Sequence, residues 1–455
     1  MTPGSETLPP WEQLTSLVAL GDRAGASVFV DGLEPLDMVR VVTRLNDEVR
    51  GDLLRLLTPE DAADVLEQIP DVQASEALEQ MPPGDAARIL EELQSDAQAD
   101  LLGDLEEVEA EAILAEMQPD DARELRDLAS YAEDSAGGLM LTEVVQVPTG
   151  LTVDQVVDHF RQHAEEYSNY DVQYAYVVDD ARRLVGVLRL RDLLMAPRWT
   201  KVESLMLRDP HSVRIDAGIE ELVHFFLEHH FFGAPVLDAD GVLRGVLRRS
   251  GVEAAAADKS DEIFRRTQGI VGGEELRSMS LFLRSRRRLA WLSVNILLNI
   301  LAASVIAMHQ DTLEAVIALA VFLPIISDMS GCSGNQAVAV SLRELTLGTI
   351  HPSDVGRVFL GEISLGAING AALGTLIGIV AWIWKGNVWL GLVVGVALAV
   401  NTVVAVCIGG IIPLILKRAG KDPALASGPI LTTISDMCGF LLVLTMASRV
   451  LKNLI

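Results

Sequence analysis

Five long apolar segments follow one another from residue 289 onward, and they restrict the fold of this chain more than any other feature. The segments cover residues 289–308, 313–342, 358–384, 388–416 and 425–451. A helix rises about 1.5 Å per residue, so each segment is long enough to cross roughly 30 Å of hydrocarbon. The sequence therefore predicts an all-α transmembrane domain of five helices over residues 286–455.

Basic residues gather on one side of these segments. They precede the first and third segments and follow the second and fourth: Arg284, Arg286, Arg287, Arg288, Arg343, Arg357, Lys417, Arg418 and Lys421. Only Arg449 and Lys452 oppose the pattern. Because cytoplasmic flanks are rich in Lys and Arg, we expect a multi-pass protein of the cell membrane with its N-terminus in the cytoplasm and its C-terminus outside.

Acidic residues crowd the region before residue 131. The whole chain has 64 Asp and Glu against 36 Lys and Arg, and its net charge is −28. Such a charge repels phosphates, so nucleic acid is excluded as a partner and cations are favoured.

Residues 1–130 contain a repeat of 12 residues. Apolar residues recur in two columns, Leu33, Leu45, Leu57, Ile69, Met81, Leu93, Leu105 and Met117, and Val42, Leu54, Leu66, Leu78, Leu90, Leu102 and Leu114. Each unit is too short to bury its own apolar face, so the repeat predicts an all-α solenoid of stacked short helices. Most of its carboxylates are expected to be solvated, and some are candidates for weak divalent-cation sites.

A β-strand and helix alternation occurs twice in residues 131–256. Strands are expected at 174–179 and 184–188, and again at 233–238 and 243–247. The string Asp238-x-x-Gly241-x-Leu243-x-Gly245 resembles a cystathionine-β-synthase (CBS) domain, so this α/β region is similar to a tandem CBS pair. The resemblance implies binding of adenine nucleotides or ions. Asp192 matches the ribose-binding Asp of that family, whereas the second copy has Arg248-Arg249, so ATP is expected in one half only.

Two further features are a pair of histidines within this region and an acidic helix after it. His159 and His163, with Glu165 and Glu166 nearby, have zinc-like spacing, but without a third convergent ligand we interpret them as an exposed helix face. Residues 257–285 are predicted to form a connecting segment, whose helix carries Asp258, Asp261 and Glu262.

Polar residues interrupt the apolar segments. Asp436 lies about 11 residues into the fifth segment, roughly 16 Å deep, and Asp328 reaches a similar depth in the second. Carboxylates at that depth favour an ion path, whereas helix-to-helix hydrogen bonding accounts for Asn369 and Asn401. Breaks at Pro324 and at Gly428-Pro429 are predicted either to pack closely or to free carbonyls that line a wet cavity.

The order of these parts closely resembles the MgtE family of magnesium channels over essentially the whole chain. The fifth segment carries the closest match, in Asp422-Pro423-Ala424, Ser427, Pro429, Ser435-Asp436 and Gly439. The resemblance implies a homodimer whose second and fifth membrane helices line the pore, with Asp436 of each subunit holding a hydrated Mg²⁺.

The resemblance also assigns roles to further residues. It implies a pore lined by Gly331, Gly334, Asn335, Gly428, Pro429 and Thr432. It implies that cytosolic Mg²⁺ closes this pore by bridging acids at positions matched by Asp216, Asp258, Asp261, Glu262 and Asp422.

Two strings depart from the family pattern. The second segment has Ser330-Gly331-Cys332-Ser333-Gly334-Asn335-Gln336 where the family tends to have Gly-Gly-Asn-x-Gly-Asn-Gln, with Asp328 added. Arg248-Arg249 stands where the family often has acids. We therefore expect closure by Mg²⁺ to be weakened.

Three functions remain open from the sequence. The first is a passive, gated channel for Mg²⁺ influx, the second an ion-coupled divalent-cation transporter or exporter, and the third a membrane-anchored CBS nucleotide sensor. An enzyme is excluded, because the sequence has neither a nucleophile with a base and an orienting group nor a phosphate-cradling loop.

Overall fold

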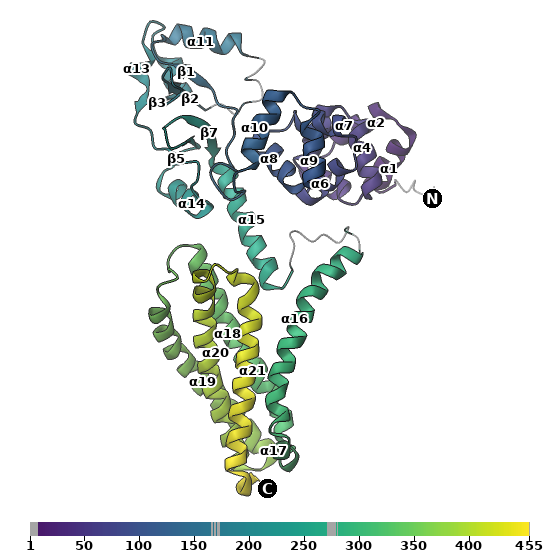
Figure 1. Cartoon of the computed structure of the whole chain (residues 1–455), viewed down its shortest axis with the longest axis vertical. Helices are drawn as coiled ribbons and strands as arrows, with labels where there is room; N and C mark the ends of the chain where they lie inside the picture. The colour runs from purple at the N-terminus through teal and green to yellow at the C-terminus, as the bar shows by residue number, and fades with distance from the viewer. Residues whose placement is uncertain are drawn as a thin grey trace, which may run out of the picture. The chain divides into compact units, whose positions relative to one another are not determined.

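The structure is a computed structural model that describes residues 8–164, 167, 170, 173–270, 279 and 281–454 (Figure 1). The chain divides into two compact units, Met1–Asp258 and Lys259–Ile455. The first unit contains the helical array and the α/β region, and the second contains the long apolar helices. This confirms the predicted multidomain fold class, while the predicted domain limits at 130, 256 and 285 stay predictions.

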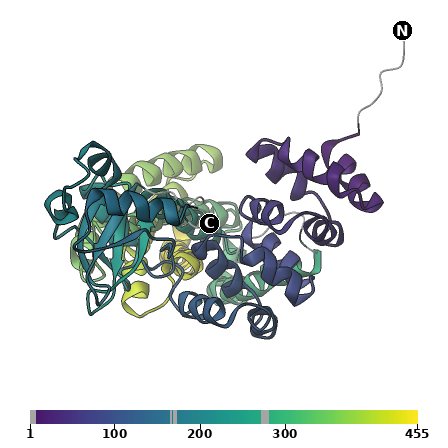
Figure 2. The same cartoon turned by 90° about the horizontal axis from the view of Figure 1, so that it is seen from above.

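Ten short helices follow one another in the N-terminal region, purple to blue in Figures 1 and 2. They are α1 (Pro10–Leu20), α2 (Arg23–Asp31), α3 (Pro35–Val42), α4 (Asp47–Leu56), α5 (Pro59–Leu66), α6 (Asp71–Glu79), α7 (Pro83–Leu90), α8 (Ser95–Asp104), α9 (Glu107–Leu114) and α10 (Pro119–Ala129). Proline occupies the first turn of α3, α5, α7 and α10, where its missing N–H is not needed.

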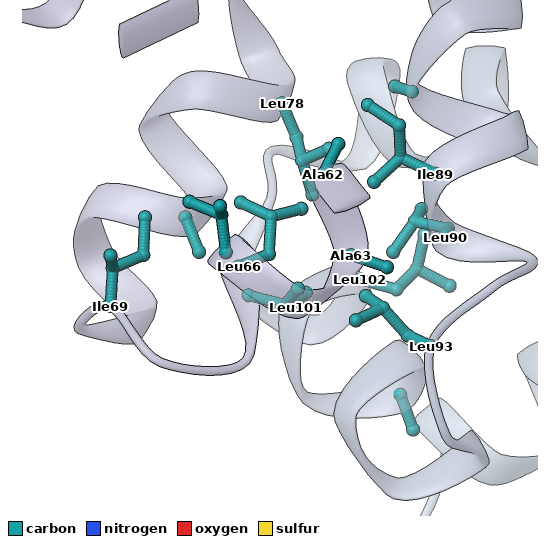
Figure 3. Packing of buried hydrophobic residues seen from close by; sticks show 14 of the residues in the cluster. Ala62, Ala63, Leu66, Ile69, Leu78, Ile89, Leu90, Leu93, Leu101 and Leu102 are labelled. Carbon is teal, nitrogen blue, oxygen red and sulfur yellow. The ribbon is translucent and has the colours of Figure 1, made fainter. Parts of the chain in front are cut away.

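The 12-residue columns form the core of this array. Leu66, Leu78, Leu90 and Leu102 are all buried, and Figure 3 shows them packing with Ala62 of the alanine column. Each helix packs against nearby helices in the array, including the next but one in sequence, as α5 does with α7 and α6 with α8. Stacking of units therefore supplies the core that no single unit has, as the repeat predicts.

The α/β region contains two small sheets. The first has the order β1-β2-β3-β4, and the second has the order β5-β6-β7. The strands are β1 (Gln146–Pro148), β2 (Tyr174–Val178), β3 (Leu184–Arg189), β4 (Leu207–Arg208), β5 (Val213–Arg214), β6 (Gly233–Leu237) and β7 (Leu243–Arg248). Helices α11 (Val153–Gln162), α12 (Leu190–Met195), α13 (Val202–Leu205) and α14 (Ile219–Glu228) accompany them.

Both copies repeat one pairing pattern. A parallel pair, β1 with β2 or β5 with β6, is followed by an antiparallel hairpin, β2 with β3 or β6 with β7. Gly241 has φ +78° in the second hairpin turn, which explains the glycine of the motif, and Arg182 takes φ +60° at the corresponding turn of the first copy. The two turns pair with each other through Arg183 and Val242.

The boundary between the two units falls within α15 (Arg249–Thr267). Gly269 follows it with φ +75°, so the predicted glycine break is present there, while Gly272 and Gly273 lie outside the described residues. The basic cluster that precedes the first apolar segment lies in the first turns of the next helix, α16 (Leu281–Ala307).

In the described part of the membrane unit there are five long helices and two short ones. The long helices are α16 (Leu281–Ala307), α18 (Leu319–Thr346), α19 (Val355–Lys385), α20 (Val388–Arg418) and α21 (Pro423–Arg449), and the short ones are α17 (Gln310–Ala315) and α22 (Leu451–Leu454). Within the described residues, four of them, α16, α19, α20 and α21, are long and apolar enough to cross a membrane. The predicted count of five is thus supported only roughly, because α18 has the length of a span but is too polar to meet the same criterion.

Two details of the predicted segments are wrong. The second segment was expected from residue 313, but the chain forms α17 first and turns at Val316 before α18 begins at Leu319. Breaks were expected at Pro324 and Gly428-Pro429, but α18 and α21 continue through both prolines. Each proline removes one helical N–H without ending the helix, since neighbouring helices hold the backbone in place.

Helix α20 lies at the centre of this unit and packs against α18, α19 and α21. Glycines allow α19 and α20 to approach closely, since a Cβ added to Gly374 would lie 2.4 Å from the carbonyl oxygen of Gly395. Small residues are the usual means of such approach in lipid, where no hydrophobic force drives helices together.

Candidate functional site

The candidate site lies where α18, α20 and α21 meet around Asp436. Asp436 is the fourteenth residue of α21, about 20 Å from the start of the helix at 1.5 Å per residue. Its side chain is 8% exposed within one chain. The hydroxyl of Ser327 on α18 donates a hydrogen bond to Asp436 Oδ1 at 2.5 Å, so the carboxylate joins two helices.

Asn401 on α20 completes this three-helix junction. It is fully buried, and its Nδ2 donates to Ser330 Oγ at 2.6 Å and to the carbonyl oxygen of Ser435 at 3.0 Å. A Cβ at Gly439 would lie 2.7 Å from that nitrogen, so the glycine gives the amide room. Asn401 therefore fixes the residue next to Asp436, as predicted from helix-to-helix hydrogen bonding.

The amide also leaves one acceptor open. Asn401 Oδ1 is buried and has no hydrogen-bond partner among the described residues. Buried polar atoms are rarely left unpaired, so a water at this level of the helices would complete the junction.

Ser327 is a member of the site that sequence reasoning missed. Serine is common in membrane helices, where its hydroxyl bonds to the carbonyl one turn earlier, as Ser330 does to Ile326 at 2.6 Å. The only available signal was its place beside Asp328 at the start of the polar run.

The predicted pore residues separate into two groups. Asn335, Gly428, Pro429 and Thr432 line one cavity of about 480 Å³, together with Trp291, Asn295, Asn299 and Thr433. Gly334 instead lies in a helix contact, because an added Cβ would come within 2.9 Å of the Ala405 carbonyl oxygen. Gly331 has open space around it.

Asp328 is not brought to Asp436. It lies exposed on α18, the residue after Ser327, and makes no hydrogen bond or ion pair within the described parts of the chain. The two predicted midplane carboxylates therefore do not converge within one chain.

Asp422 forms the N-cap of α21. Its Oδ1 accepts from the backbone N–H of Ala424 at 2.8 Å, and its Oδ2 accepts from Arg266 Nη1 at 2.8 Å. Arg266 Nη2 also lies 2.5 Å from Glu262 Oε1. Two predicted metal-binding acids, Asp422 and Glu262, are therefore joined by one guanidinium.

The other predicted regulatory acids lie apart from this pair. Asp258 and Asp261 are exposed on α15. Asp216 is exposed and accepts a hydrogen bond from Arg214 Nε at 2.8 Å, and that guanidinium holds the pKa of the Asp216 carboxyl below its usual range. Among the described residues, no three His, Cys, Asp or Glu side chains gather closely enough to hold a metal ion.

A cluster of acidic residues lies in the first unit on α8 and its neighbours. Burial raises the pKa of Asp100 to about 7, and Asp96, Asp71, Glu133 and Asp104 add to the rise through their charges. Asp258 contributes in turn to a raised pKa at Asp71, where burial is the main cause.

Arg248 contacts the edge of this cluster. Its Nη2 donates to Gln94 Oε1 at 2.7 Å and lies 3.7 Å from Asp96 Oδ2. The arginine that departs from the family pattern thus links β7 to the helical array.

The predicted nucleotide and zinc residues have local partners. Asp192 Oδ2 accepts from Arg189 Nε at 2.6 Å. The rings of His159 and His163 are 4.3 Å apart, and His159 Nε2 lies 3.2 Å from the Tyr167 hydroxyl. Glu165 and Glu166, named with these histidines, lie outside the described residues.

Family models match three regions of the chain. A divalent cation transporter model matches residues 323–446, an MgtE intracellular N domain model matches 33–134, and a CBS domain model matches 136–198 and 202–256. Together these matches cover the helical array from α3 onward, both CBS copies and most of the membrane unit.

Individual relatives agree with these matches. The chain is 34% identical to the magnesium transporter MgtE of Thermus thermophilus over 340 residues, which cover 73% of this chain and 74% of that protein. It is 30% identical to the magnesium transporter MgtE of Bacillus subtilis, with 73% of each chain covered.

A solved structure resembles the first unit. It is the crystal structure of the cytosolic domain of the Mg²⁺ channel MgtE in complex with ATP, with 33% identity, a TM-score of 0.50, and coverage of 54% of this chain and 99% of that one. Members of this group are transporters and not enzymes, in agreement with the sequence. The chain belongs to the MgtE family of magnesium transporters.

Proposed function

We propose that this chain forms a homodimeric channel through which Mg²⁺ enters the cell passively, with Asp436 of each subunit at the ion-binding level. The observation that carries the proposal is the environment of Asp436. Its carboxylate lies deep in a membrane helix, and its one hydrogen bond among the described residues comes from a neutral hydroxyl, that of Ser327. A carboxylate in such surroundings needs a cation or a proton.

The available ligands suit Mg²⁺. This ion prefers oxygen ligands and dehydrates reluctantly, so a carboxylate from each of two subunits would bind it through retained water. The nearby oxygens of Ser327 and Asn401, and the side chains of Asn335 and Thr432 along the cavity, would orient those waters. A divalent cation moving inward gains roughly 4.6 kcal/mol per 100 mV, so influx needs no second energy source.

The orientation follows the distribution of basic residues. We place the N-terminus and both cytosolic regions inside the cell, the C-terminus outside, and the protein in the plasma membrane. Arg284, Arg286 and Arg287 near the start of α16 would then lie at the cytoplasmic surface.

Growth rescue of a Mg²⁺-import-deficient bacterium tests the proposal. Asp436→Asn keeps an oxygen for the Ser327 hydroxyl but removes the charge, so we expect expression and dimerisation to persist and rescue to be lost. Asp311→Asn removes an exposed carboxylate from α17 and should rescue as well as the parent chain. Full rescue by Asp436→Asn would refute the assignment.

The coupled-transport alternative makes a different prediction. Flux through a passive channel follows the Mg²⁺ gradient and the membrane potential alone, whereas a coupled transporter also requires a proton or Na⁺ gradient. Mg²⁺ uptake into vesicles that is abolished by collapse of either gradient at fixed potential would favour the transporter.

The proposal also includes control of the pore by cytosolic Mg²⁺. We infer that cytosolic Mg²⁺ acts on the acids of the first unit and of α15, and that its closing effect is weakened because arginines already occupy several of them. Arg266 holds Asp422 and Glu262, and Arg248 contacts Asp96. Patch recordings that show full closure by low-millimolar cytosolic Mg²⁺ would refute the weakening.

Nucleotide binding is a second candidate activity of the CBS pair. The relative with a solved cytosolic domain was crystallised with ATP. Asp192 of the first copy is the residue that, by its resemblance to CBS domains, matches the ribose-binding Asp of that family. Its bond to Arg189 keeps the carboxylate at the start of α12. Loss of ATP binding in Asp192→Ala, with binding retained in Asp180→Ala, would support this candidate.

A further inference from the structure

One carboxyl group of the membrane unit lies outside the proposed ion path, that of Glu362 on α19. It is the eighth residue of this helix, about 10 Å from the helix start at 1.5 Å per residue. The orientation proposed above places this end of α19 toward the cytoplasm. A carboxyl group within a membrane helix is costly, so its presence there indicates a function.

The surroundings of Glu362 do not suit an ionised carboxylate. The side chain is only partly exposed, and its Oε2 is buried with no hydrogen-bond partner among the described residues. Within the same part of the chain, no Lys, Arg or His forms an ion pair with it. A protonated carboxyl group has no charge to be desolvated and carries an O–H donor of its own.

The titratable groups that face Glu362 offer no positive charge. They are Glu344 on α18 and Cys407 on α20, which both interact with it electrostatically. Glu344 repels a second negative charge, and a thiol supplies no counter-charge. A proton is therefore the simplest partner for the Glu362 carboxyl group.

Glu362 packs on the backbone of α20 at Gly410. A Cβ added to Gly410 would lie 2.7 Å from Glu362 Cγ, so the glycine leaves room for the side chain. Pro413 lies within the same helix and has no N–H, so the carbonyl oxygen of Gly409 loses its usual helical donor. Helix α20 thus has a backbone acceptor beside the residue on which Glu362 packs.

Gly410 is also joined to α18, the predicted pore helix. The hydroxyl of Ser341 donates to the Gly410 carbonyl oxygen at 2.8 Å, and Ser341 is 2% exposed. Ser341 lies about 21 Å further along α18 than Ser327, which contacts Asp436. Glu362, Gly410 and Ser341 therefore connect α19, α20 and α18 at a level separate from Asp436.

We propose that Glu362 binds a proton from the cytoplasmic side and thereby makes Mg²⁺ flux depend on pH. The step moves one proton from hydronium to the carboxylate and leaves one water, so it needs no other reactant. The neutral carboxyl group donates to the backbone of α20, keeps α19 on Gly410 and so holds α18 through Ser341.

Ionisation reverses these effects. The carboxylate draws water into the junction, which loosens the hold on the cytoplasmic half of α18, and its negative charge attracts cations to that end of the helices. Flux should therefore fall as the pH falls. This inference rests on the proposed Mg²⁺ influx and its orientation.

Mg²⁺ uptake into liposomes that contain the full-length protein tests the inference. The membrane potential is fixed, the pH is equal on both sides so that no proton gradient drives transport, and Mg²⁺ is saturating so that Asp436 stays ionised. Uptake by the parent chain should fall at least about threefold between about pH 8 and pH 6. Glu362→Gln is neutral throughout, so its uptake should be low and vary less than about 1.5-fold, whereas Glu362→Asp should retain the pH dependence.

Infrared difference spectroscopy detects the proton itself, a readout that a merely structural role would not change. The C=O band of a protonated carboxyl group should appear in the parent on acidification and be absent from Glu362→Gln. Ser341→Ala should keep this band but lose most of the pH dependence of uptake, because the link to α18 is cut. Asp311→Asn, on the exposed face of α17, is the control and should match the parent in both measurements.

Two results would overturn the inference. One is an equal fall of uptake on acidification in the parent and in Glu362→Gln, and the other is an infrared spectrum that is the same in both. Absence of Mg²⁺ uptake by the parent at every pH would refute the proposed function instead, and the infrared band would still decide whether Glu362 binds a proton.

Discussion

Asp100 should make the helical array less stable as the pH rises. Burial is the main cause that raises its pKa from 3.8 to about 7, and the charges of Asp96 and Asp71 add to it. In the unfolded chain the carboxyl returns to its ordinary pKa. The folded state therefore binds the proton more tightly, and this contribution is fully present below about pH 4 and lost as the pH rises to about 7.

The size of the effect follows from the two pKa values. A difference of about 3 units at about 1.4 kcal/mol per unit corresponds to about 4 kcal/mol of stability lost above pH 7. Asp100→Asn removes the charge but leaves an amide to be desolvated, which costs about 2 kcal/mol. We therefore expect the variant to be more stable than the parent by about 2 kcal/mol at pH 8 and less stable by about 2 kcal/mol at pH 4.

Amide hydrogen exchange of α8 in the full-length protein measures this difference. A gain of about 2 kcal/mol slows exchange about 30-fold at pH 8 after correction for the intrinsic rate. Asp127→Asn, an exposed position on α10, is the control and should show no pH-dependent gain. Millimolar Mg²⁺ should reduce the pH dependence of the parent, because a bound cation stabilises the ionised carboxylates.

The reasoning is refuted if protection of α8 in the parent increases between pH 5 and pH 8. It is also refuted if Asp100→Asn stabilises α8 equally at both values. Either result would mean that burial of Asp100 does not hold its proton.

Three further changes test the membrane unit. Gly374→Val places a side chain against the Gly395 carbonyl oxygen, so α19 and α20 must separate, and we expect a loss of about 2–4 kcal/mol seen as a lower melting temperature in detergent. Asn401→Leu keeps the volume but removes both hydrogen bonds at the junction, so Mg²⁺ flux should fall at least about tenfold with normal expression. Arg266→Gln frees Asp422 and should allow cytosolic Mg²⁺ to inhibit current at about threefold to tenfold lower concentration.

Each of these changes has a control in the same helices. Gly361→Val on α19 meets no atom within 4 Å and should melt like the parent. Asn369→Leu makes the same change as Asn401→Leu outside the junction and should leave flux unchanged. Arg265→Gln removes a neighbouring charge without an ion pair to Asp422. Equal effects of a variant and its control would contradict the corresponding prediction.

Sequence reasoning succeeded where structure depends on local pattern. The 12-residue register identified Leu66, Leu78 and Leu90 as core because each helix buries the same face. It failed at the start of the second membrane helix, because the apolar residues before Leu319 belong to α17 and a turn that composition does not reveal. Helices α18 and α21 continue through Pro324 and Pro429 for a similar reason, since packing with neighbours outweighs the local preference.

The sequence predicted the central carboxylate of the site but not the residues that contact it. A carboxylate in a membrane segment carries a large free-energy cost of burial, so its presence there indicates a function. Asp436 could therefore be predicted from the sequence alone. Its partner Ser327 and the unpaired oxygen of Asn401 could not be predicted in this way. Serine and asparagine in a helix can form hydrogen bonds with nearby backbone groups, so their presence in a membrane segment carries no comparable free-energy cost. The partner of Asp422 could not be predicted either, because Arg266 lies 156 positions earlier in the chain and no sequence spacing connects the two residues.

The arginines explain why the acids of this chain need not all respond to Mg²⁺. Arg214, Arg248 and Arg266 contact Asp216, Asp96 and Asp422, so these acids already have a tethered counter-charge. A tethered cation loses little freedom when it binds, whereas a free ion must be brought from solution and partly dehydrated. We propose that Mg²⁺ acts first where no guanidinium reaches, near Asp71, Asp100 and Asp104, the carboxyl groups whose pKa values are raised. In this proposal the ion would regulate through α8 and its neighbours, while the arginine pairs would keep their contacts at millimolar Mg²⁺.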